Sequence, residues 1–463
     1  MERISESILG KAMEKKENFG SVLGFIMAAA GSAVGLGNIW RFPYLAAKYG
    51  GGLFLIVYII LALTFGYALM TVEISLGRRT GKSVIGAYKA TDKRFAFLGP
   101  IASLVPFIIT PYYCVIGGWV LKYLVVFITG DGNKGAVEDG YFSSFIGQTA
   151  SPTVFFAVFA VITAMVVLLG VKKGIETVSK ILMPVLIIIT IGIAVYTMTI
   201  PGASAGVKYY FLPSFDDFSL GFLLKTVVAA MGQMFYSMSL AMGIMVTYGS
   251  YMRKEDSVES SVRQISFFDT LVAILAGLII VPSVFAFSGG DASALNAGPS
   301  LMFVTLPKVF NSMVGGQIVG SAFFILVALA ALTSSISLFE TMVSIIMEKF
   351  NMKRIKATIV CFIILVVLGM TSVLGYSDWS GVTIFGYQFL DFYDFISNNI
   401  IMPIVSLLTC ILIGYFAKTV FVEDEVESSG HKMKTKKLFR VMVLAVCPVF
   451  MIIILLTPFI TSL

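Results

Sequence analysis

The sequence contains few of the residues on which metal centres, disulfide frameworks and hydrolytic sites depend. Among its 463 residues there is one histidine, His431, which lies in a charged segment. The four cysteines lie in apolar stretches without paired spacing, at Cys114, Cys361, Cys410 and Cys447. This distribution argues against a disulfide framework and against a thiolate metal site. Because no histidine lies in an apolar stretch, a buried serine–histidine pair is excluded as well, and we do not expect an enzyme.

Charged residues are also scarce, at 13% of the chain, whereas 58% of the residues are hydrophobic. A soluble protein of this size could not bury so much apolar surface, so we expect a polytopic protein of the lipid bilayer. The formal net charge is +7, but the cationic residues fall in short loops, where they indicate orientation rather than nucleic acid binding. The absence of a phosphate-binding loop of the Walker A type argues against a nucleotide-driven pump.

Eleven apolar stretches are long enough to cross a bilayer, which takes about 20 helical residues. They predict an all-α membrane protein with eleven transmembrane helices, at 20–43, 52–77, 97–128, 152–170, 175–200, 219–249, 264–288, 317–348, 355–375, 388–417 and 440–460.

Lysine and arginine gather in every second loop between these stretches. Basic clusters precede the first span, follow spans two, four, six and eight, and precede span eleven, whereas the intervening loops are poor in lysine and arginine. The positive-inside rule then predicts a cytoplasmic N-terminus and, with eleven spans, an extracellular C-terminus. The polar segment 1–18 has no signal-peptide pattern, so we expect the first span itself to direct insertion into the cell membrane.

Two of the predicted spans are interrupted by residues that break helices. Residues 30–44 in span one include three glycines, an arginine and a proline, and residues 232–243 in span six include glycines, serines and a glutamine. In hydrocarbon an unpaired backbone group is costly, so broken helices occur where they line a cavity or hold a ligand. The two interruptions therefore predict a binding site near the middle of the bilayer.

The spacing of the interruptions, five spans apart, also predicts the domain organisation. It indicates two inverted five-helix halves, at 19–200 and 201–418, followed by a basic cytoplasmic loop at 419–439 and one additional helix at 440–463. One extracellular connection, at about 289–314, is long and has a turn signal before an apolar stretch. We expect a helical hairpin that acts as a lid there, and a solvated loop is the alternative.

Four segments together resemble the neurotransmitter:sodium symporters, in particular their bacterial amino-acid-transporting branch. They are residues 31–44, the triple glycine at 50–52, residues 233–243 and residues 330–335, and the match runs in register from about residue 15 to 415. The resemblance implies a symporter that uses the sodium gradient to import a neutral, hydrophobic or aromatic L-amino acid by alternating access. Alternatives on the same fold are a carrier of a small or γ-amino acid, a channel and a non-transporting amino-acid sensor.

Two sodium sites are implied by the resemblance. A broken helix frees backbone carbonyls, which suit a hard cation without a buried formal charge. The first site is implied at Ala33, Asn38, Ser237 and Asp269. The second site is implied at Gly31, Val34, Ala330, Thr333 and Ser334. Taken alone, the hydroxyl residues at 333–335 favour close helix packing, a role that we keep for Ser335.

The implied substrate site lies between the same spans. Amides near Gly35 and Leu36 would face the substrate carboxylate. Monoamine carriers of the family have an aspartate in place of Gly35, so this glycine favours an amino acid, although a purely conformational role is equally consistent locally. Tyr236 stands where a bacterial leucine transporter of the family has phenylalanine, which leaves the substrate side chain open. The implied contacts are Ala33, Gly35, Leu36, Gly37, Ile109, Tyr113, Phe235, Tyr236, Ser237, Ser239, Ala241, Met242, Ser334 and Leu338.

An extracellular gate is implied by the same register. Arg41 and Asp394 would pair above the substrate, and Asp391 competes for the role of Asp394. Tyr113 and Tyr236 would form an aromatic layer beneath that pair.

On the inner side, Lys16 and Glu348 fall where the family has its cytoplasmic gate pair. A lysine replaces the usual arginine, so the bidentate fork is lost, and two solvated helix ends are the alternative. Gly174 and Pro184 enclose nine residues at the start of span five. This spacing resembles the family's unwinding motif, which admits water to a sodium site.

Three acidic residues lie within apolar stretches, where a carboxylate is a candidate for function. Asp269 stands where chloride-dependent animal relatives have an asparagine, and Ala273 lacks the hydroxyl of a chloride ligand, so we expect no chloride requirement. The alternative for Asp269 is a hydrated position at the end of span seven. We expect Glu73 to accept hydrogen bonds from the unwound part of span six, and we assign no role to Glu340.

Overall fold

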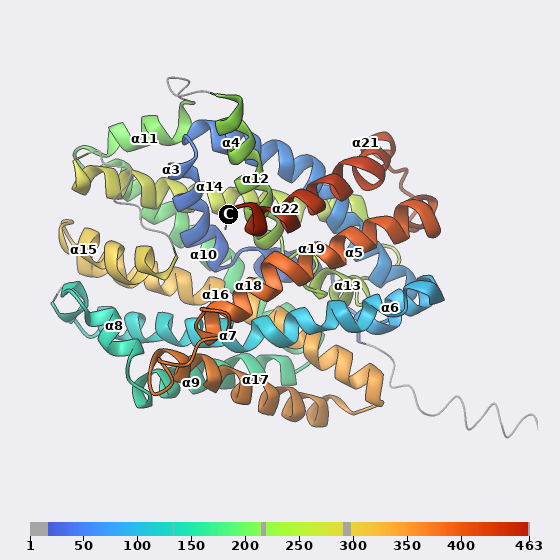
Figure 1. Ribbon diagram of the computed structural model, residues 1–463, viewed down its shortest axis with the longest axis horizontal. Helices are drawn as coiled ribbons and strands as arrows, with labels where there is room; N and C mark the ends of the chain where they lie inside the picture. Colours follow the sequence, from blue (N-terminus) through green and yellow to red (C-terminus); the bar gives the residue numbers. More distant parts are fainter. Residues whose placement is uncertain (1–16, 133, 214–218, 290–297, 462–463) are drawn as a thin grey trace, which may run out of the picture.

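Figure 1 shows the computed structural model of the chain, which describes residues 17–132, 134–213, 219–289 and 298–461. Within these ranges the secondary structure is helical, apart from isolated β-bridges between Gly51 and Pro213 and between Ile384 and Tyr387. The predicted all-α class is therefore confirmed.

Among the described residues, ten helices are long and apolar enough to cross a membrane, and a bent pair at the start of the chain makes an eleventh span. In chain order the spans consist of α2 (Val22–Ala33), η1 (Gly37–Arg41) and α3 (Phe42–Lys48); α4 (Gly52–Leu61), η2 (Ala62–Gly66) and α5 (Tyr67–Thr80); α7 (Leu98–Ile128); α9 (Ala150–Leu168); η5 (Val171–Glu176) and α10 (Thr177–Met198); α12 (Leu220–Ser237) and α13 (Ile244–Gly249); α14 (Val258–Ser288); α16 (Gly316–Phe350); α17 (Arg354–Tyr376); α18 (Phe389–Phe395), η8 (Ile396–Ile401), α19 (Met402–Ile411) and η9 (Leu412–Phe416); and α21 (Lys436–Val441), η10 (Met442–Val446) and α22 (Cys447–Thr461).

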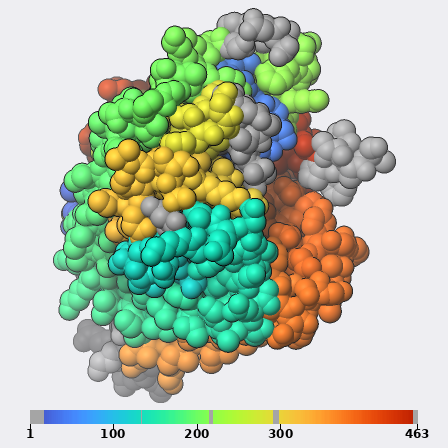
Figure 2. Space-filling view, turned by 90° about the vertical axis from the view of Figure 1, so that its left-hand side faces the viewer, coloured from blue at the N-terminus to red at the C-terminus, as the bar shows by residue number. Residues whose placement is uncertain are grey.

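Short helices lie at both ends of this bundle. At one end, on the right of Figure 1 and here called the α6 end, lie α6 (Val84–Thr91), α20 (Val420–Glu427) and the start of α21. At the opposite end, here called the α15 end, lie α8 (Tyr141–Ile146), α11 (Ala203–Phe211), η7 (Leu301–Thr305) and α15 (Leu306–Asn311). Figure 2 views the α15 end, where α8 and α15 lie side by side on the surface. Of the lid predicted at about 289–314, residues 290–297 lie outside the described residues.

The first span is broken at the predicted glycines. α2 ends at Ala33 and η1 begins at Gly37, and the two halves of the span are inclined by 53°. The amide of Gly35 donates to the side chain of Asn38 at 3.1 Å. Because this amide is engaged with a side chain, it does not close the helical bond to the carbonyl of Gly31. The break therefore frees a carbonyl at the end of α2.

The sixth span is broken over a shorter stretch than the interruption predicted at 232–243. α12 continues as far as Ser237, so Gly232 and Gln233 lie inside a helix. A single glycine costs a helix only about 1 kcal/mol, and packing against neighbouring spans outweighs that cost. The break itself contains Ser239 and Ala241 with φ angles of 53° and 58°. Positive φ angles at residues other than glycine are strained and cluster at functional sites.

The loop predicted as basic at 419–439 begins with an acidic helix, α20. Glu425 of this helix pairs with the buried Arg78 of α5 at 2.7 Å. Glu423 pairs with Arg440 at 2.7 Å, and these bonds hold the pKa of Glu423 below its usual range. Through the pair of Glu425 with Arg78, α20 thus links the connection between the last two spans to the end of α5.

The broken segments lie in the centre of the bundle. α16 packs against α7 and α2, and all three helices are largely buried. α9 and α10 lie outside and expose apolar side chains such as Val154, Ile181 and Ile188, as expected of surfaces that face lipid. The breaks are therefore enclosed by protein, which is where irregular backbone is tolerated at membrane depth.

Candidate ion and substrate sites

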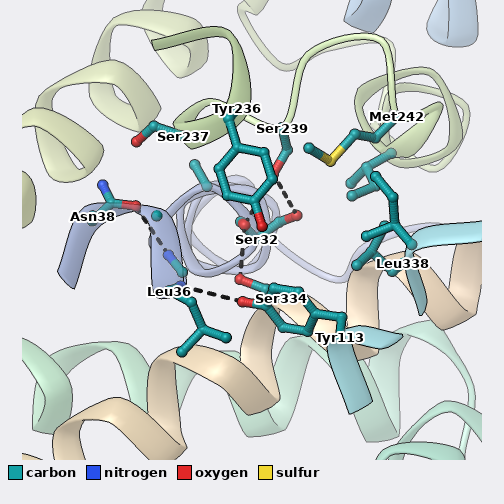
Figure 3. Close-up of a pocket in the computed structure, with 15 residues that line it drawn as sticks. Ser32, Leu36, Asn38, Tyr113, Tyr236, Ser237, Ser239, Met242, Ser334 and Leu338 are labelled. Atoms are coloured by element: carbon teal, nitrogen blue, oxygen red, sulfur yellow. Dashed lines mark hydrogen bonds between the residues drawn. The ribbon is translucent and has the colours of Figure 1, made fainter. Parts of the chain in front are cut away.

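A small cavity lies between the two breaks (Figure 3). It is lined by Ser32, Ala33, Gly35, Leu36, Gly37, Asn38, Ile109, Tyr113, Tyr236, Ser237, Ser239, Met242, Ile244, Ser334 and Leu338. The structure thus brings together twelve of the predicted substrate contacts, from the first, third, sixth and eighth spans.

Two of the predicted substrate contacts, Phe235 and Ala241, do not line this cavity although both are buried. Phe235 precedes Tyr236 on α12 and therefore points to another side of the helix. The amide of Ala241 donates to the carboxylate of Glu73 at 2.7 Å, as the sequence predicts for Glu73. In turn, the prediction missed Ser32 and Ile244 as lining residues. Ser32 lies within the recognised segment 31–44 and Ile244 directly follows the segment 233–243, but only the geometry of the breaks turns them toward the cavity.

Of the first predicted sodium site, Asn38 and Ser237 contact the carboxylate of Asp269, and Ala33 lines the cavity beside them. This carboxylate is fully buried and accepts hydrogen bonds from Asn38 at 2.7 Å, Ser237 at 2.9 Å and Tyr58 at 3.2 Å. No cationic side chain of the described chain pairs with it. The alternative of a hydrated position at the end of span seven is therefore wrong.

A buried carboxylate without a compensating cation is unfavourable. The oxygens of Asp269, Ser237 and Asn38 form the kind of hard donor set that a sodium ion prefers. Groups of three or more His, Cys, Asp or Glu side chains that could hold a metal ion do not occur in the described part of the chain. The candidate ion sites thus consist of neutral oxygens and a single carboxylate.

The residues of the second predicted sodium site meet where α2 ends beside α16. The hydroxyl of Ser334 lies 3.4 Å from the carbonyl oxygens of both Gly31 and Val34. Thr333, one residue earlier on α16, donates to the carbonyl of Ala330 at 3.1 Å. A Cβ on Gly31 would lie only 3.2 Å from the Cβ of Thr333. Carbonyl and hydroxyl oxygens from both helices are therefore gathered in one place.

The glycines beside this site let side chains of neighbouring spans approach the backbone closely. A Cβ on Gly35 would lie 2.8 Å from the hydroxyl of Ser334 and 2.9 Å from that of Tyr113. A Cβ on Gly37 would lie 2.7 Å from the ring of Tyr236. The amide of Leu36 donates to Tyr113 at 3.3 Å. Because no side chain fits at Gly35, an acidic residue could not take its place without rearrangement.

The cavity has a polar side and an apolar side. In Figure 3, Asn38 and Ser237 lie on one side, Met242 and Leu338 lie on the other, and Ser334 lies between them. The cavity volume is about 20 Å³, which is room for about one water molecule. Pockets for small organic ligands usually measure about 300–1,000 Å³. Side chains that line the cavity must therefore move before an amino acid can enter.

The predicted extracellular ion pair is not formed. The guanidinium of Arg41 lies over the ring of Tyr236, 5.7 Å from its centroid. Asp394 accepts hydrogen bonds from Tyr112 at 3.1 Å and from Asn398 at 2.6 Å. Arg41 and Asp394 are thus engaged by aromatic or polar neighbours in this conformation, and their pairing in a closed gate stays a prediction.

The predicted inner gate is only partly described, because Lys16 lies outside the described residues. Glu348 is exposed and accepts a hydrogen bond from the amide of Ser83 at 2.5 Å. Of the predicted unwinding motif, Gly174 lies in the widened turn η5 and Pro184 lies inside α10.

Two further carboxylates take part in contacts that the sequence did not predict. Glu176 of η5 accepts a hydrogen bond from Ser21 at 2.9 Å and thereby joins the start of the fifth span to that of the first. Glu340, which had no assigned role, pairs with Arg354 at 2.6 Å and accepts from Tyr251 at 2.7 Å. Both contacts depend on tertiary packing, and no local pattern indicates them.

The family model of the sodium:neurotransmitter symporters matches residues 16–133 and 141–462. The chain belongs to this family. An uncharacterised sodium-dependent transporter of Bacillus subtilis, YhdH, is 36% identical over 404 residues, which are 86% of this chain and 88% of the relative. An uncharacterised sodium-dependent transporter of Haemophilus influenzae is 33% identical over 437 residues, 91% of this chain and 93% of the relative.

The fold is similar to the crystal structure of MhsT in complex with L-phenylalanine. The TM-score is 0.84 and the identity 36%, with 96% of this chain and 99% of MhsT covered. These similarities confirm the predicted family and the helical fold with a broken first span. The protein is a sodium-dependent symporter with many membrane spans, and not an enzyme.

Proposed function

We propose that this symporter couples sodium to the import of a neutral, hydrophobic or aromatic L-amino acid by alternating access. Two sodium ions would bind, one at Ala33, Asn38, Ser237 and Asp269, and the other at Gly31, Val34, Ala330, Thr333 and Ser334. The amino acid would bind between them, in the cavity at the two breaks.

The observation that carries the proposal is the buried carboxylate of Asp269, which has three hydrogen-bond donors and, among the described residues, no cationic side chain paired with it. A sodium ion would supply the missing charge. The same carboxylate is surrounded by Tyr58 and Ser237, which match the chloride surroundings of animal relatives. We therefore propose that its fixed charge replaces chloride.

The polar side and the apolar side of the cavity together favour an amino acid with an apolar side chain as the substrate. Its carboxylate would face the amides near Gly35 and Leu36, Tyr113 and the first sodium ion. Its side chain would face Met242 and Leu338, and a flexible methionine adapts to different apolar shapes. MhsT, with its bound L-phenylalanine, supports this cargo by similarity.

Because the substrate carboxylate and the first sodium ion would share ligands, each would raise the affinity for the other by the same factor.

Closure above the substrate would bring Arg41 from Tyr236 toward Asp394. Residues 298–314 support the lid proposal: Phe303 packs on Trp40 of η1 with ring centroids 6.5 Å apart.

We assign the α6 end to the cytoplasm, because the predicted basic loops lie there.

The proposal is tested by uptake into proteoliposomes from a panel of labelled amino acids that includes phenylalanine, leucine, glycine and γ-aminobutyric acid. We expect concentrative uptake of the large apolar amino acids with an inward sodium gradient, and none when choline replaces sodium. A channel or sensor would not concentrate any of them. Preference for glycine or γ-aminobutyric acid would support the alternative cargo.

A further inference from the structure

A second cavity lies at the α6 end, away from the ion and substrate sites. Its volume is about 370 Å³, and its lining includes Lys82, Lys89, Lys93, Lys349 and Glu348. Lys349 is 15 residues after Ser334 on α16, which corresponds to roughly 22 Å along a helix. The second cavity is therefore a separate feature, for which the symport proposal has no use.

The charge around this cavity is strongly one-sided. Four lysines line it together with one carboxylate, that of Glu348, which accepts the amide hydrogen of Ser83. Among the described residues no carboxylate lies within 4.0 Å of any of the four ammonium groups. Elsewhere at the same end, Arg78 and Arg440 are paired with glutamates. The four lysines thus present uncompensated positive charge to one hollow.

The helix α6 lies at the edge of the bundle (Figure 1) and carries Lys89, whereas Lys82 and Lys93 flank it in the chain and Lys349 lies on α16. Its apolar side, with Val84 and Ala87, is buried against α7 and α5. Tyr88 anchors it further, since its hydroxyl lies 2.7 Å from that of Thr409 on α19. Lys89 of α6 and Lys82, two residues before the helix, remain exposed. The apolar side of α6 is thus packed, and the lysines on it and beside it stay accessible.

Two exposed apolar side chains are close in sequence to lysines that line the cavity. Phe97, four residues after Lys93, is 52% exposed, and Phe350, next to Lys349, is 54% exposed. In a membrane protein such side chains face lipid or the interface, where lysine side chains extend toward headgroups. Basic pockets between spans at the cytoplasmic side bind phosphate-bearing lipid headgroups. The cavity volume falls within the range of about 300–1,000 Å³ that is usual for small ligands.

We propose that this cavity binds the phosphate group of an anionic phospholipid headgroup from the leaflet at the α6 end. The four ammonium groups would surround the phosphate, and the acyl chains would extend along the exposed apolar side chains. A bound headgroup would join α6 to the end of α16. The inference rests on insertion into a membrane and not on sodium coupling, so either proposal can fail alone.

The test uses the full-length protein in nanodiscs of phosphatidylcholine with increasing fractions of phosphatidylglycerol, and native mass spectrometry to count the retained lipid. We expect the wild type to retain phosphatidylglycerol selectively. The variant K82Q/K89Q/K93Q/K349Q should lower that affinity at least about tenfold, because it removes the four charges of the basic pocket that would surround the phosphate.

The matched control is K353Q/K356Q/K432Q/K437Q, which removes the same charge from four exposed lysines at the same end that do not line the cavity. It should retain the lipid as the wild type does. Equal loss in both variants would show general surface attraction, and unchanged binding in the cavity variant would exclude the site; either result overturns the proposal.

Two further measurements distinguish the source of the phosphate and the role of charge. Millimolar inorganic phosphate should not displace phosphatidylglycerol; displacement would show a site for soluble phosphate and overturn the lipid assignment. The charge-preserving variant K82R/K89R/K93R/K349R should keep the lipid, and its failure to do so would contradict recognition by charge. This variant also serves if the glutamine variant does not fold.

Discussion

At the residue scale, three consecutive hydroxyls of α16 point in different directions. Thr333 donates to Ala330 beside the freed carbonyls of α2, and Ser334 contacts those carbonyls directly. Ser335 turns away and lies 3.0 Å from Thr163 on α9. A helix rotates by about 100° per residue, since it has about 3.6 residues per turn. Neighbours of identical chemistry can therefore serve an ion site and helix packing respectively.

This geometry predicts different effects of two matched substitutions. Thr333→Ala removes a proposed sodium ligand and should raise the sodium concentration for half-maximal substrate binding at least about tenfold, the equivalent of about 1.4 kcal/mol. Ser335→Ala removes only a packing hydroxyl and should leave that concentration unchanged. Sodium titration of labelled amino acid binding measures both, and equal shifts would contradict the assignment of Thr333.

Gly35 offers a second prediction at this scale. An added Cβ would press on Ser334 and Tyr113, so Gly35→Ala should weaken amino acid binding at least about tenfold. The control is Gly192→Ala on α10, where a Cβ meets no atom within 4 Å and alanine favours a helix by about 1 kcal/mol over glycine. Equilibrium binding of the labelled amino acid to the two purified variants measures both affinities. Wild-type affinity in Gly35→Ala would exclude close contact of the ligand with this backbone.

At the element scale, α20 connects distant parts of the chain. The side chain of Arg78, which is fully buried, binds the carboxylate and carbonyl of Glu425 and the hydroxyl of Ser428. Lys254, in the connection between the sixth and seventh spans, binds the same carboxylate at 2.8 Å. One short helix thus joins the ends of three spans by ionic contacts.

Removal of the buried cation should therefore destabilise the protein. Arg78→Ala leaves Glu425 with only the exposed Lys254 as a cationic partner, and loss of one partner of a buried pair costs about 3–5 kcal/mol. Arg79→Ala, which removes an exposed arginine stacked on Phe421, should cost much less. Thermal unfolding of the purified variants measures whether Arg78→Ala loses more stability than Arg79→Ala. Similar unfolding temperatures for both would contradict a stabilising role for the buried network.

The sequence predicted the elements better than their ends. The break in span one could be located because glycines cluster at 31–37, and the structure has its break at 34–36. In span six the glycine at 232 lies inside α12 instead, because tertiary packing offsets its low helix propensity. The contact between Glu340 and Arg354 joins residues on two helices, and no helical periodicity relates them.

At the scale of the whole molecule, motif register predicted which spans would meet, and the structure brings twelve predicted contacts from four spans to one cavity. The register of the motifs does not predict which conformation of the transport cycle the protein adopts. Arg41 lies on Tyr236 and not at Asp394, and the cavity measures only about 20 Å³. Both features depend on small differences between alternative packings of the same contacts.

Chloride independence is a prediction for the whole transport cycle. If Asp269 supplies the negative charge in place of chloride, as proposed, replacement of chloride by gluconate should leave the rate of sodium-driven uptake unchanged. Uptake into proteoliposomes in the two media measures this. An obligatory requirement for chloride would show that Asp269 does not take its place.

The central claim, that sodium and an amino acid bind together at the two breaks, is tested most directly by equilibrium binding of labelled L-phenylalanine to the purified protein. We predict saturable binding in sodium, loss of binding in choline, and a reciprocal decrease in the half-saturating sodium concentration as phenylalanine increases. In Asp269→Asn the sodium dependence should weaken at least about tenfold, whereas Asp424→Asn, at an exposed carboxylate of α20, should behave as wild type. Equal phenylalanine binding in sodium and choline would contradict the account.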